Sequence, residues 1–181
     1  MLFILGALLI FVFLIIIIFA FPQFSPVPYF PSNHKDRELI LKSLNLQNNQ
    51  LVIDLGAGDG WVIFAAAQLS LTKKLNTQFI ATEINPFLLL ILYCKSFFHP
   101  NRKNIQIKYF DIFKNNYQSL TTNHKSLITF YLYLSPWLIA QIEEKIKKIK
   151  NKKTVVAYYY ALKNTHPKQT IQGTNKIFIY N

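Results

Sequence analysis

The chain has 181 residues, 51% of them hydrophobic, and a formal net charge of +12. This length suffices for one domain with a hydrophobic core. The single cysteine, Cys94, excludes an internal disulfide and fits a reducing compartment. Cysteine and histidine form no cluster at metal-ligand spacing, so we expect no metal site.

A positive net charge can indicate nucleic-acid binding, but the pattern here favours another interpretation. Arginine occurs only at Arg37 and Arg102, and the densest lysine run, residues 143–150, keeps apolar residues at helical spacing. We interpret that run as the solvated face of a helix, with attraction to anionic lipid headgroups as a second interpretation. No nucleic-acid partner is expected.

The N-terminus is an almost wholly apolar run, residues 2–21. As a helix, about 20 residues span roughly 30 Å, the thickness of bilayer hydrocarbon. A secretory signal peptide is the alternative, but the run lacks a basic start and ends in a poor cleavage site at residues 19–22. The sequence therefore predicts an uncleaved transmembrane anchor at residues 1–22.

Basic residues flank this run on one side only: Lys35, Arg37 and Lys42 follow it and none precedes it. The positive-inside rule then predicts a single-pass membrane protein whose C-terminal part lies in the cytoplasm. Prolines recur in residues 23–33, which predicts an extended linker of about 3 Å per residue. The linker would keep a domain at residues 34–181 within roughly 30 Å of the bilayer.

The domain is expected to begin with a helix over residues 34–44, capped by Ser32 or Asn33, and a polar loop over residues 45–50. Strands and helices alternate from there, and residues 111–123 are expected to form a polar connection. The first expected strand begins at residue 51, and the other six cover about 77–83, 105–110, 127–133, 154–160, 168–172 and 175–180. The expected helices cover about 61–69, 86–98 and 136–150.

This order of elements predicts the fold class. The apolar run at residues 127–133 is typical of a central parallel strand, and the last two strands are close enough to form an antiparallel hairpin. We expect an α/β fold with a Rossmann-like, seven-stranded, mostly parallel sheet and a C-terminal antiparallel hairpin, preceded by one N-terminal transmembrane helix.

The first strand of the domain runs into a glycine-rich turn, Asp54-Leu55-Gly56-Ala57-Gly58-Asp59-Gly60. Glycine adopts backbone angles closed to other residues and lets a ligand approach the main chain. A strand, a glycine turn and a helix N-terminus together form a nucleotide-sized site. The spacing differs from the dinucleotide fingerprint G-x-G-x-x-G, and Asp54 and Asp59 would repel a pyrophosphate but attract a cationic ligand.

Two further acids follow later strands. Glu83 ends the second expected strand, where an acid commonly binds ribose hydroxyls, and Asp111 follows the third. Together with the turn, these residues resemble the class I methyltransferases, which use S-adenosylmethionine (SAM) and whose signature is an apolar strand ending in acid-x-Gly-x-Gly-x-Gly. The resemblance implies that Asp111 accepts a hydrogen bond from the adenine amino group.

A second resemblance covers Pro28-Tyr29-Phe30-Pro31-Ser32. This segment is similar to the P-Y-x-P-[ST] entry of the small membrane-anchored lysine methyltransferases related to those that modify the ATP synthase c-subunit, where it lies over the SAM pocket. Packing of an ordinary linker is the alternative. Taken together, the two resemblances imply a set of SAM-binding residues: Tyr29, Pro31, Asp54, Gly56, Gly58, Asp59, Gly60, Glu83, Asn85 and Asp111.

The methyl acceptor is expected at the end of the strand over residues 127–133. Methyltransferases that act on nucleic-acid amino groups often carry [DN]-P-P-[FY] there, whereas this chain has Leu134-Ser135-Pro136-Trp137. The aromatic and apolar strand followed by a proline is similar to the anchored lysine methyltransferases. The substrate edge that this resemblance implies consists of Tyr131, Tyr133, Ser135 and Pro136.

A lysine acceptor must first lose its proton, because with a pKa near 10.4 only about one in 2,000–3,000 is neutral at pH 7. An aromatic mouth made by Tyr29, Tyr131, Tyr133 or Trp137 would lower that pKa through desolvation and hold cations by cation–π contact. We therefore expect a membrane-anchored SAM-dependent methyltransferase acting on a lysine of a membrane or membrane-proximal protein. Two alternatives stay open: a methyltransferase acting on a lipid or small membrane-soluble molecule, and a SAM-binding module without activity.

Overall fold

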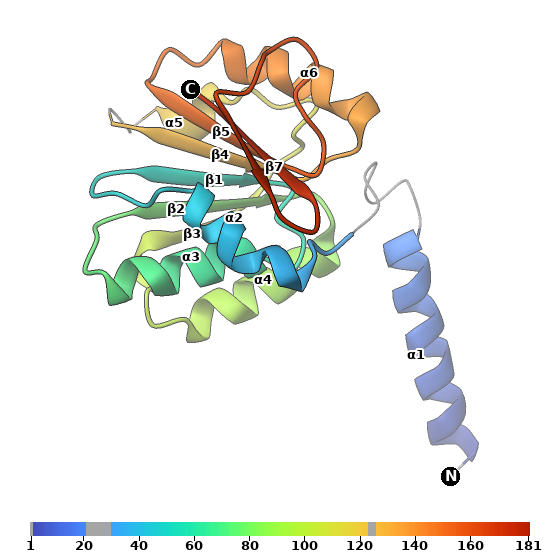
Figure 1. Cartoon of the computed structure of the whole chain (residues 1–181). Helices are drawn as coiled ribbons and strands as arrows, with labels where there is room; N and C mark the ends of the chain where they lie inside the picture. The colour runs from blue at the N-terminus through green and yellow to red at the C-terminus, as the bar shows by residue number, and fades with distance from the viewer. Residues whose placement is uncertain (1, 21–29, 123–125) are drawn as a thin grey trace.

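The computed structural model describes residues 2–20, 30–122 and 126–181. Within these residues seven strands form one sheet in the order β3-β2-β1-β4-β5-β7-β6, in which β7 runs antiparallel to both its neighbours. The strands are β1 (Leu51–Leu55), β2 (Gln78–Glu83), β3 (Ile105–Tyr109), β4 (Ile128–Leu132), β5 (Lys153–Tyr158), β6 (Gln169–Gln172) and β7 (Lys176–Tyr180). The expected mostly parallel sheet with a C-terminal hairpin is confirmed (Figure 1).

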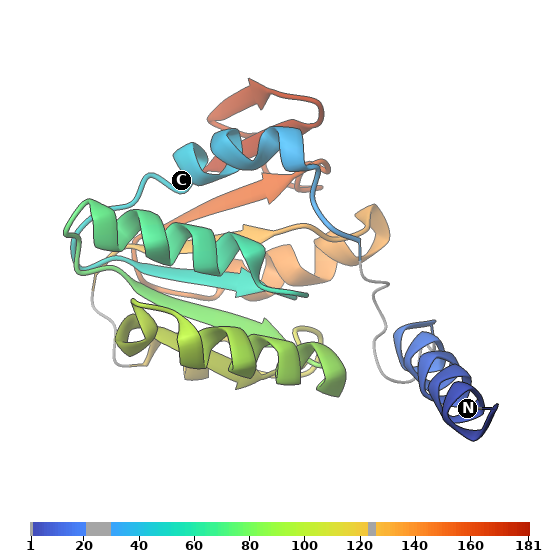
Figure 2. The same ribbon diagram turned by 90° about the horizontal axis from the view of Figure 1, so that it is seen from below.

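Helices cover both faces of this sheet, which explains why β1 and β4 are buried at every position. On one face α2, α3 and α4 pack against residues such as Val52 and Phe79, and on the other α5 and α6 pack against residues such as Ile53 and Phe130 (Figure 2). The helices are α1 (Leu2–Ala20), α2 (Arg37–Ser43), α3 (Trp61–Thr72), α4 (Pro86–Phe98), α5 (Gln118–Thr121) and α6 (Pro136–Lys147).

The expected elements differ from the observed ones mainly at their ends. The helix expected over residues 34–44 starts with a 3-10 turn, His34–Asp36, capped by the Asn33 side chain. The polar connection at residues 111–123 contains the short helix α5, because Tyr117 and Leu120 turn inward and are buried. The strand expected to reach residue 160 ends at Tyr158.

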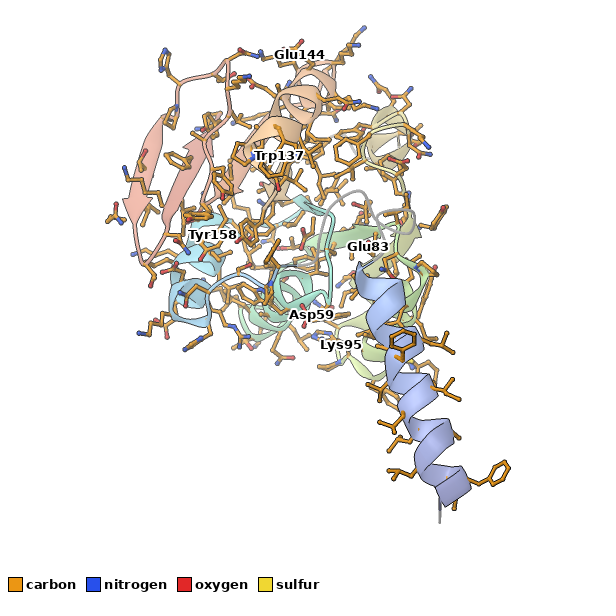
Figure 3. The ribbon with its side chains drawn as sticks, turned by 90° about the vertical axis from the view of Figure 1, so that its right-hand side faces the viewer. Asp59, Glu83, Lys95, Trp137, Glu144 and Tyr158 are labelled. Carbon is orange, nitrogen blue, oxygen red and sulfur yellow. The ribbon has the colours of Figure 1, made fainter. Side chains whose placement is uncertain are left out.

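The expected helix at the N-terminus is present as α1. Its described large apolar side chains, from Phe3 to Leu14, are exposed, and Figure 3 shows them pointing outward around the helix. By length and hydropathy, no helix among the described residues qualifies as one able to cross a membrane. Most of the expected linker lies outside the described residues, and residues 30–33 have no regular secondary structure.

Candidate functional site

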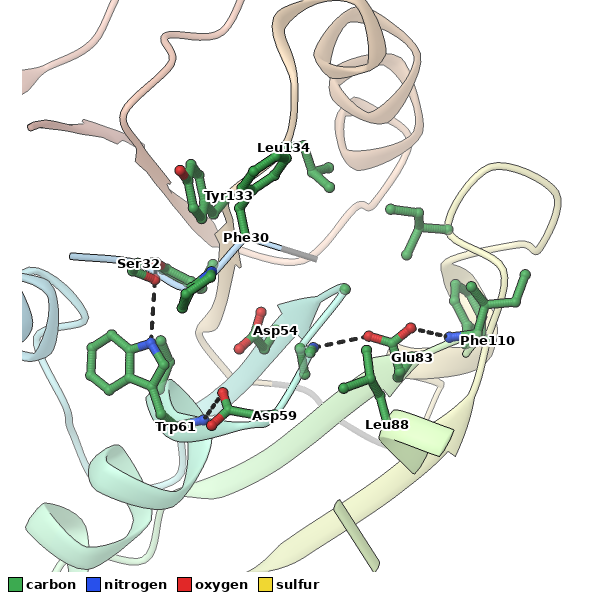
Figure 4. A pocket seen from close by; sticks show the side chains of 18 of the residues that line it. Phe30, Ser32, Asp54, Asp59, Trp61, Glu83, Leu88, Phe110, Tyr133 and Leu134 are labelled. Carbon is green, nitrogen blue, oxygen red and sulfur yellow. Dashed lines mark hydrogen bonds between the residues drawn. The ribbon is translucent and has the colours of Figure 1, made fainter. Parts of the chain in front are cut away.

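A pocket of about 800 Å³, counting its open mouth, lies at the carboxyl ends of β1, β2 and β4 (Figure 4). The strand order reverses between β1 and β4, with β2 and β3 on one side and β5 on the other. Open α/β sheets bind their ligands at such a switch point, outside the carboxyl ends of the strands.

The glycine turn forms the floor of this pocket. Gly56 and Gly58 line it and have φ values of 81° and 59°, in the left-handed region that favours glycine. Gly60 does not line the pocket; a Cβ there would collide with the side chains of Phe64 and Leu92, so this glycine lets α3 and α4 approach each other.

Glu83 holds the turn from the neighbouring strand. Its Oε2 accepts a hydrogen bond of 2.9 Å from the Gly58 amide, and its Oε1 accepts bonds of 2.8 and 2.9 Å from the amides of Ile84 and Asn85. Burial raises the pKa of the Glu83 carboxyl, although these three bonds oppose the rise. Asn85 does not line the pocket and caps α4 through its Oδ1, which accepts from the amides of Phe87 and Leu88.

Asp54 is the most unusual group in the pocket. Its side chain points into the cavity at the end of β1, yet the residue is only 3% exposed. Among the described residues, no hydrogen bond or ion pair reaches its carboxylate oxygens. Burial raises the pKa of Asp54 well above its usual value, and the charges of Glu83 and Asp59 raise it further. A buried carboxylate without a partner is costly, and a cation in the cavity would remove that cost.

The other two acids of the pocket already have partners. Asp59 accepts a bond of 3.0 Å from the Lys95 ammonium, and the two side chains lie beside each other in Figure 3. Asp111 Oδ1 accepts from the amides of Phe113 and Lys114 at 2.8 and 3.2 Å, which fixes the loop after β3. Asp111 Oδ2 takes part only in a loose ion pair with Lys114, at 3.8 Å, among the described residues.

The segment Phe30–Ser32 lies across the pocket and lines it. The Ser32 hydroxyl accepts a hydrogen bond from the Trp61 indole N–H and pairs with the Tyr131 hydroxyl, both at 3.3 Å. Pro31 also lines the pocket, whereas Tyr29 lies outside the described residues. The structure thus brings together Ser32, Trp61 and Tyr131, which lie far apart in the sequence.

Two of the four residues of the expected substrate edge line the pocket and two do not. Tyr131 and Tyr133 line the pocket, and burial raises the pKa of both phenols. Ser135 and Pro136 do not line it and instead begin α6, and the Trp137 side chain is 76% exposed outside it.

A cluster of tyrosines that the sequence did not single out extends this edge. The ring of Tyr133 lies 5.0 Å from that of Tyr158 and 6.3 Å from that of Tyr159, and the rings of Tyr159 and Tyr160 are 4.4 Å apart. Tyr159 has a φ of 72°, which is rare for a bulky residue and turns the chain after β5. The run of three tyrosines at residues 158–160, at the end of an expected strand, is the feature of the sequence that could have predicted this cluster. Other lining residues missed from the sequence include Phe30, Trp61, Val62, Leu88, Phe110, Ile112 and Phe113.

No protein-family model and no curated protein matches the chain. Solved structures do share its fold. An RNA methyltransferase from Salinibacter ruber in complex with S-adenosyl-L-homocysteine is similar at a TM-score of 0.68 and 16% identity, over 83% of this chain and 92% of that one. A precorrin-6y C5,15-methyltransferase from Geobacter metallireducens is similar at a TM-score of 0.55 and 18% identity, over 76% and 68% of the two chains.

A SAM-dependent methyltransferase from Geobacter sulfurreducens, also in complex with S-adenosyl-L-homocysteine, is similar at a TM-score of 0.53 and 11% identity, over 82% of this chain and 58% of that one. Identities this low show the fold alone. The chain therefore has a fold that it shares with SAM-dependent methyltransferases.

Proposed function

We propose that the chain is a SAM-dependent methyltransferase. The observation that carries this proposal is Asp54, a buried carboxylate that faces a cavity beside a glycine turn and has no hydrogen-bond or ion-pair partner among the described residues. SAM is a cationic ligand, and it supplies an electrophilic methyl group when bound. The fold shared with proteins crystallised with S-adenosyl-L-homocysteine supports the same cofactor.

The pocket offers acceptors for the rest of such a cofactor. A carboxylate has about four lone-pair sites, and three backbone amides occupy three of those on Glu83, so one site on Oε2 stays open for a ribose hydroxyl. This is fewer than the pair of hydroxyls that the sequence suggested. Asp111 Oδ2, which takes part only in the loose ion pair with Lys114 among the described residues, would accept from the adenine amino group. Apolar side chains such as Leu88 and Phe113 would cover the flat faces of the base.

For the methyl acceptor we propose the amine of a protein lysine. The tyrosine rings of Tyr133, Tyr159 and Tyr160 stand beside the pocket, and such rings attract a methylated or protonated ammonium. Their apolar faces also desolvate an amine, which lowers its pKa and favours the neutral nucleophile.

We further propose that α1 holds the protein at a membrane, with the domain on the cytoplasmic side. The exposed apolar side chains of α1 support this, because a contiguous apolar surface of that size needs an apolar environment. The acceptor would then be a lysine on a membrane or membrane-proximal protein.

The test incubates the full chain with native membranes and with SAM carrying a labelled methyl group. Digestion and mass measurement should find the label on lysine in a membrane protein. An Asp54→Ala chain serves as the inactive control. Label that extracts into organic solvent would identify a lipid acceptor, label on RNA would identify a nucleic-acid acceptor, and binding of SAM without transfer would identify a module without activity.

A further inference from the structure

The outer face of α4 is apolar, although it does not face the core. Leu88, Leu89 and Leu92 are buried on its inner side. On its outer side Leu90, Tyr93 and Phe97 follow one another at spacings of three and four residues, which places them on one stripe, and Cys94 and Phe98 widen it. The exposed fractions are 59% for Leu90, 53% for Tyr93, 65% for Phe97 and 82% for Phe98, and Cys94 is exposed as well. We call these five residues the α4 patch.

Positive charge alone borders the α4 patch along the chain. Residues 84–110 contain no Asp or Glu, and their basic residues are Lys95, Arg102, Lys103 and Lys108. The Arg102 guanidinium lies 5.8 Å from the centre of the Phe97 ring, so the cation sits directly against the patch. The ammonium of Lys95 is bound to Asp59.

An apolar groove between α3 and α4 continues the patch toward the pocket. Its lining includes Trp61, Phe64, Cys94 and Phe98. Trp61 also lines the pocket of the candidate site, and Leu88 at the start of α4 does so too. The patch, the groove and the pocket mouth therefore belong to one side of the domain.

The same side receives the chain that comes from α1. Phe30 lines the pocket, and the ten residue-to-residue steps from Ala20 to Phe30 span at most about 35 Å. A bilayer that holds α1 is therefore within reach of α4. Aromatic side chains on a helix match the boundary between headgroups and acyl chains when the neighbouring sequence carries basic residues and no acidic ones, as residues 84–110 do.

We propose that the α4 patch docks on the headgroup–acyl boundary of the bilayer that holds α1, an inference that rests on the proposed anchoring of α1. Docking would hold the domain in one orientation, with the pocket mouth beside the membrane surface. It would also cover apolar side chains that water otherwise contacts.

Because Cys94 is the only cysteine, a nitroxide label can be attached to the patch without other changes. The full chain is reconstituted in vesicles of phosphatidylcholine and phosphatidylglycerol. Paramagnetic resonance then compares collisions of the nitroxide with oxygen, which enters the bilayer, and with a nickel chelate, which stays in water. We expect the label to report a depth of roughly 5–10 Å into the boundary. A label at Gln169→Cys in a Cys94→Ser chain, on the exposed β6 strand, should collide freely with nickel.

Substitution separates docking from mere proximity. Tyr93→Ser with Phe97→Ser should make the Cys94 label accessible to nickel, whereas Leu71→Ser, an exposed apolar residue on α3, should leave it protected. Flotation of the vesicles tests anchoring by itself. Protein that floats while its Cys94 label meets nickel as freely as the label at position 169 overturns the docking proposal and leaves anchoring intact. Protein that does not float overturns both. Dipolar broadening between labels in the absence of vesicles would show that a second copy covers the face, and would also overturn the proposal.

Discussion

We expect Asp54 to destabilise the cofactor-free protein and to strengthen its binding of a cationic ligand. The pKa of Asp54 is raised in the folded protein, so the folded state favours the protonated carboxyl. The stabilisation from this preference is fully present below the ordinary pKa of an aspartate and is lost as pH rises through the folded pKa. The carboxylate is therefore destabilising once it is ionised, and a cation in the cavity would offset that cost.

The substitution Asp54→Asn should consequently have effects of opposite sign. We expect the free energy of unfolding of the cofactor-free protein at pH 7 to rise by about 1 kcal/mol or more, since each unit of pKa shift corresponds to about 1.4 kcal/mol. The gain should shrink as pH falls. SAM affinity should drop at least about tenfold. Thermal unfolding across pH and calorimetry measure the two quantities, with exposed Glu144→Gln as control. Loss of stability in the cofactor-free Asp54→Asn protein would contradict this account of the pocket.

Glu83 should behave differently, because it stabilises the empty protein as well. Glu83→Ala removes the acceptor of the amides of Gly58, Ile84 and Asn85. Each of these amides that water does not reach should lower the free energy of unfolding by about 1–3 kcal/mol. We expect a lower melting temperature together with at least a tenfold loss of SAM affinity. Glu83→Gln can keep the two bonds to its Oε1 and should fall between. SAM affinity that is unchanged in Glu83→Ala would remove Glu83 from the cofactor site.

At the scale of elements, Asp36 joins α2 to the C-terminal hairpin. Its carboxylate accepts from the Thr174 amide at 2.7 Å, the Asn175 amide at 2.9 Å and the Tyr158 hydroxyl at 2.8 Å. Burial acts to raise the pKa of Asp36, but hydrogen bonds from Asn175, Tyr158 and Thr174 lower it overall. A Cβ on Gly173 would collide with the carboxylate, so glycine permits this contact.

Because the folded pKa of Asp36 is lowered, its stabilisation is present above the ordinary pKa of an aspartate and is lost as pH falls through the folded value. Asp36→Asn should lower the free energy of unfolding at pH 7 by about 2–3 kcal/mol, as expected when hydrogen bonds to a charged group are lost. The difference from the wild-type chain should close in acid. Chemical unfolding at several pH values measures it, and Glu38→Gln, exposed on the same helix, should have no such effect. A difference that stays constant with pH would show that the charge of Asp36 is not what matters.

The sheet was predictable because its central strands are continuous apolar runs separated by glycine, proline and polar stretches. The helix at residues 86–98 was found to the residue, since Asn85 and Pro86 mark its start. Helix α5 was missed because its segment is mostly polar and only Tyr117 and Leu120 face the core among its larger side chains.

In the candidate site, too, local sequence patterns predicted some residues and missed others. Glycines and acids at strand ends are local signals, so Asp54, Gly58 and Glu83 could be placed from the sequence. Contacts such as Ser32 with Tyr131 join residues 99 positions apart, and no local pattern encodes them. The left-handed backbone of Tyr159 was equally hidden, because tyrosine is not a residue that favours that conformation.

At the scale of the whole molecule, we expect the rate of methylation to depend on the length of chain between α1 and the domain. Inserting about 20 glycine and serine residues between Ala20 and Phe30 makes that stretch about three times as long, and effective concentration falls roughly as the −3/2 power of length, or about fivefold. We expect methylation of a membrane protein in the same vesicle to slow by about that factor. Methylation of a soluble peptide should be unchanged. Equal slowing of both acceptors would mean that the insertion damages the site itself.

The two tryptophans occupy contrasting places, and this gives the protein an optical signal of its own. The Trp61 indole lines the pocket, donates to Ser32 and lies 5.1 Å from the Arg37 guanidinium, whereas Trp137 is 76% exposed. Emission from Trp137 should resemble that of tryptophan in water and stay constant, so any change in fluorescence on adding SAM should come from Trp61. A Trp137→Phe chain should keep the full change and a Trp61→Phe chain should lose it. Filling of the pocket can then be followed in real time, in vesicles and without any attached dye.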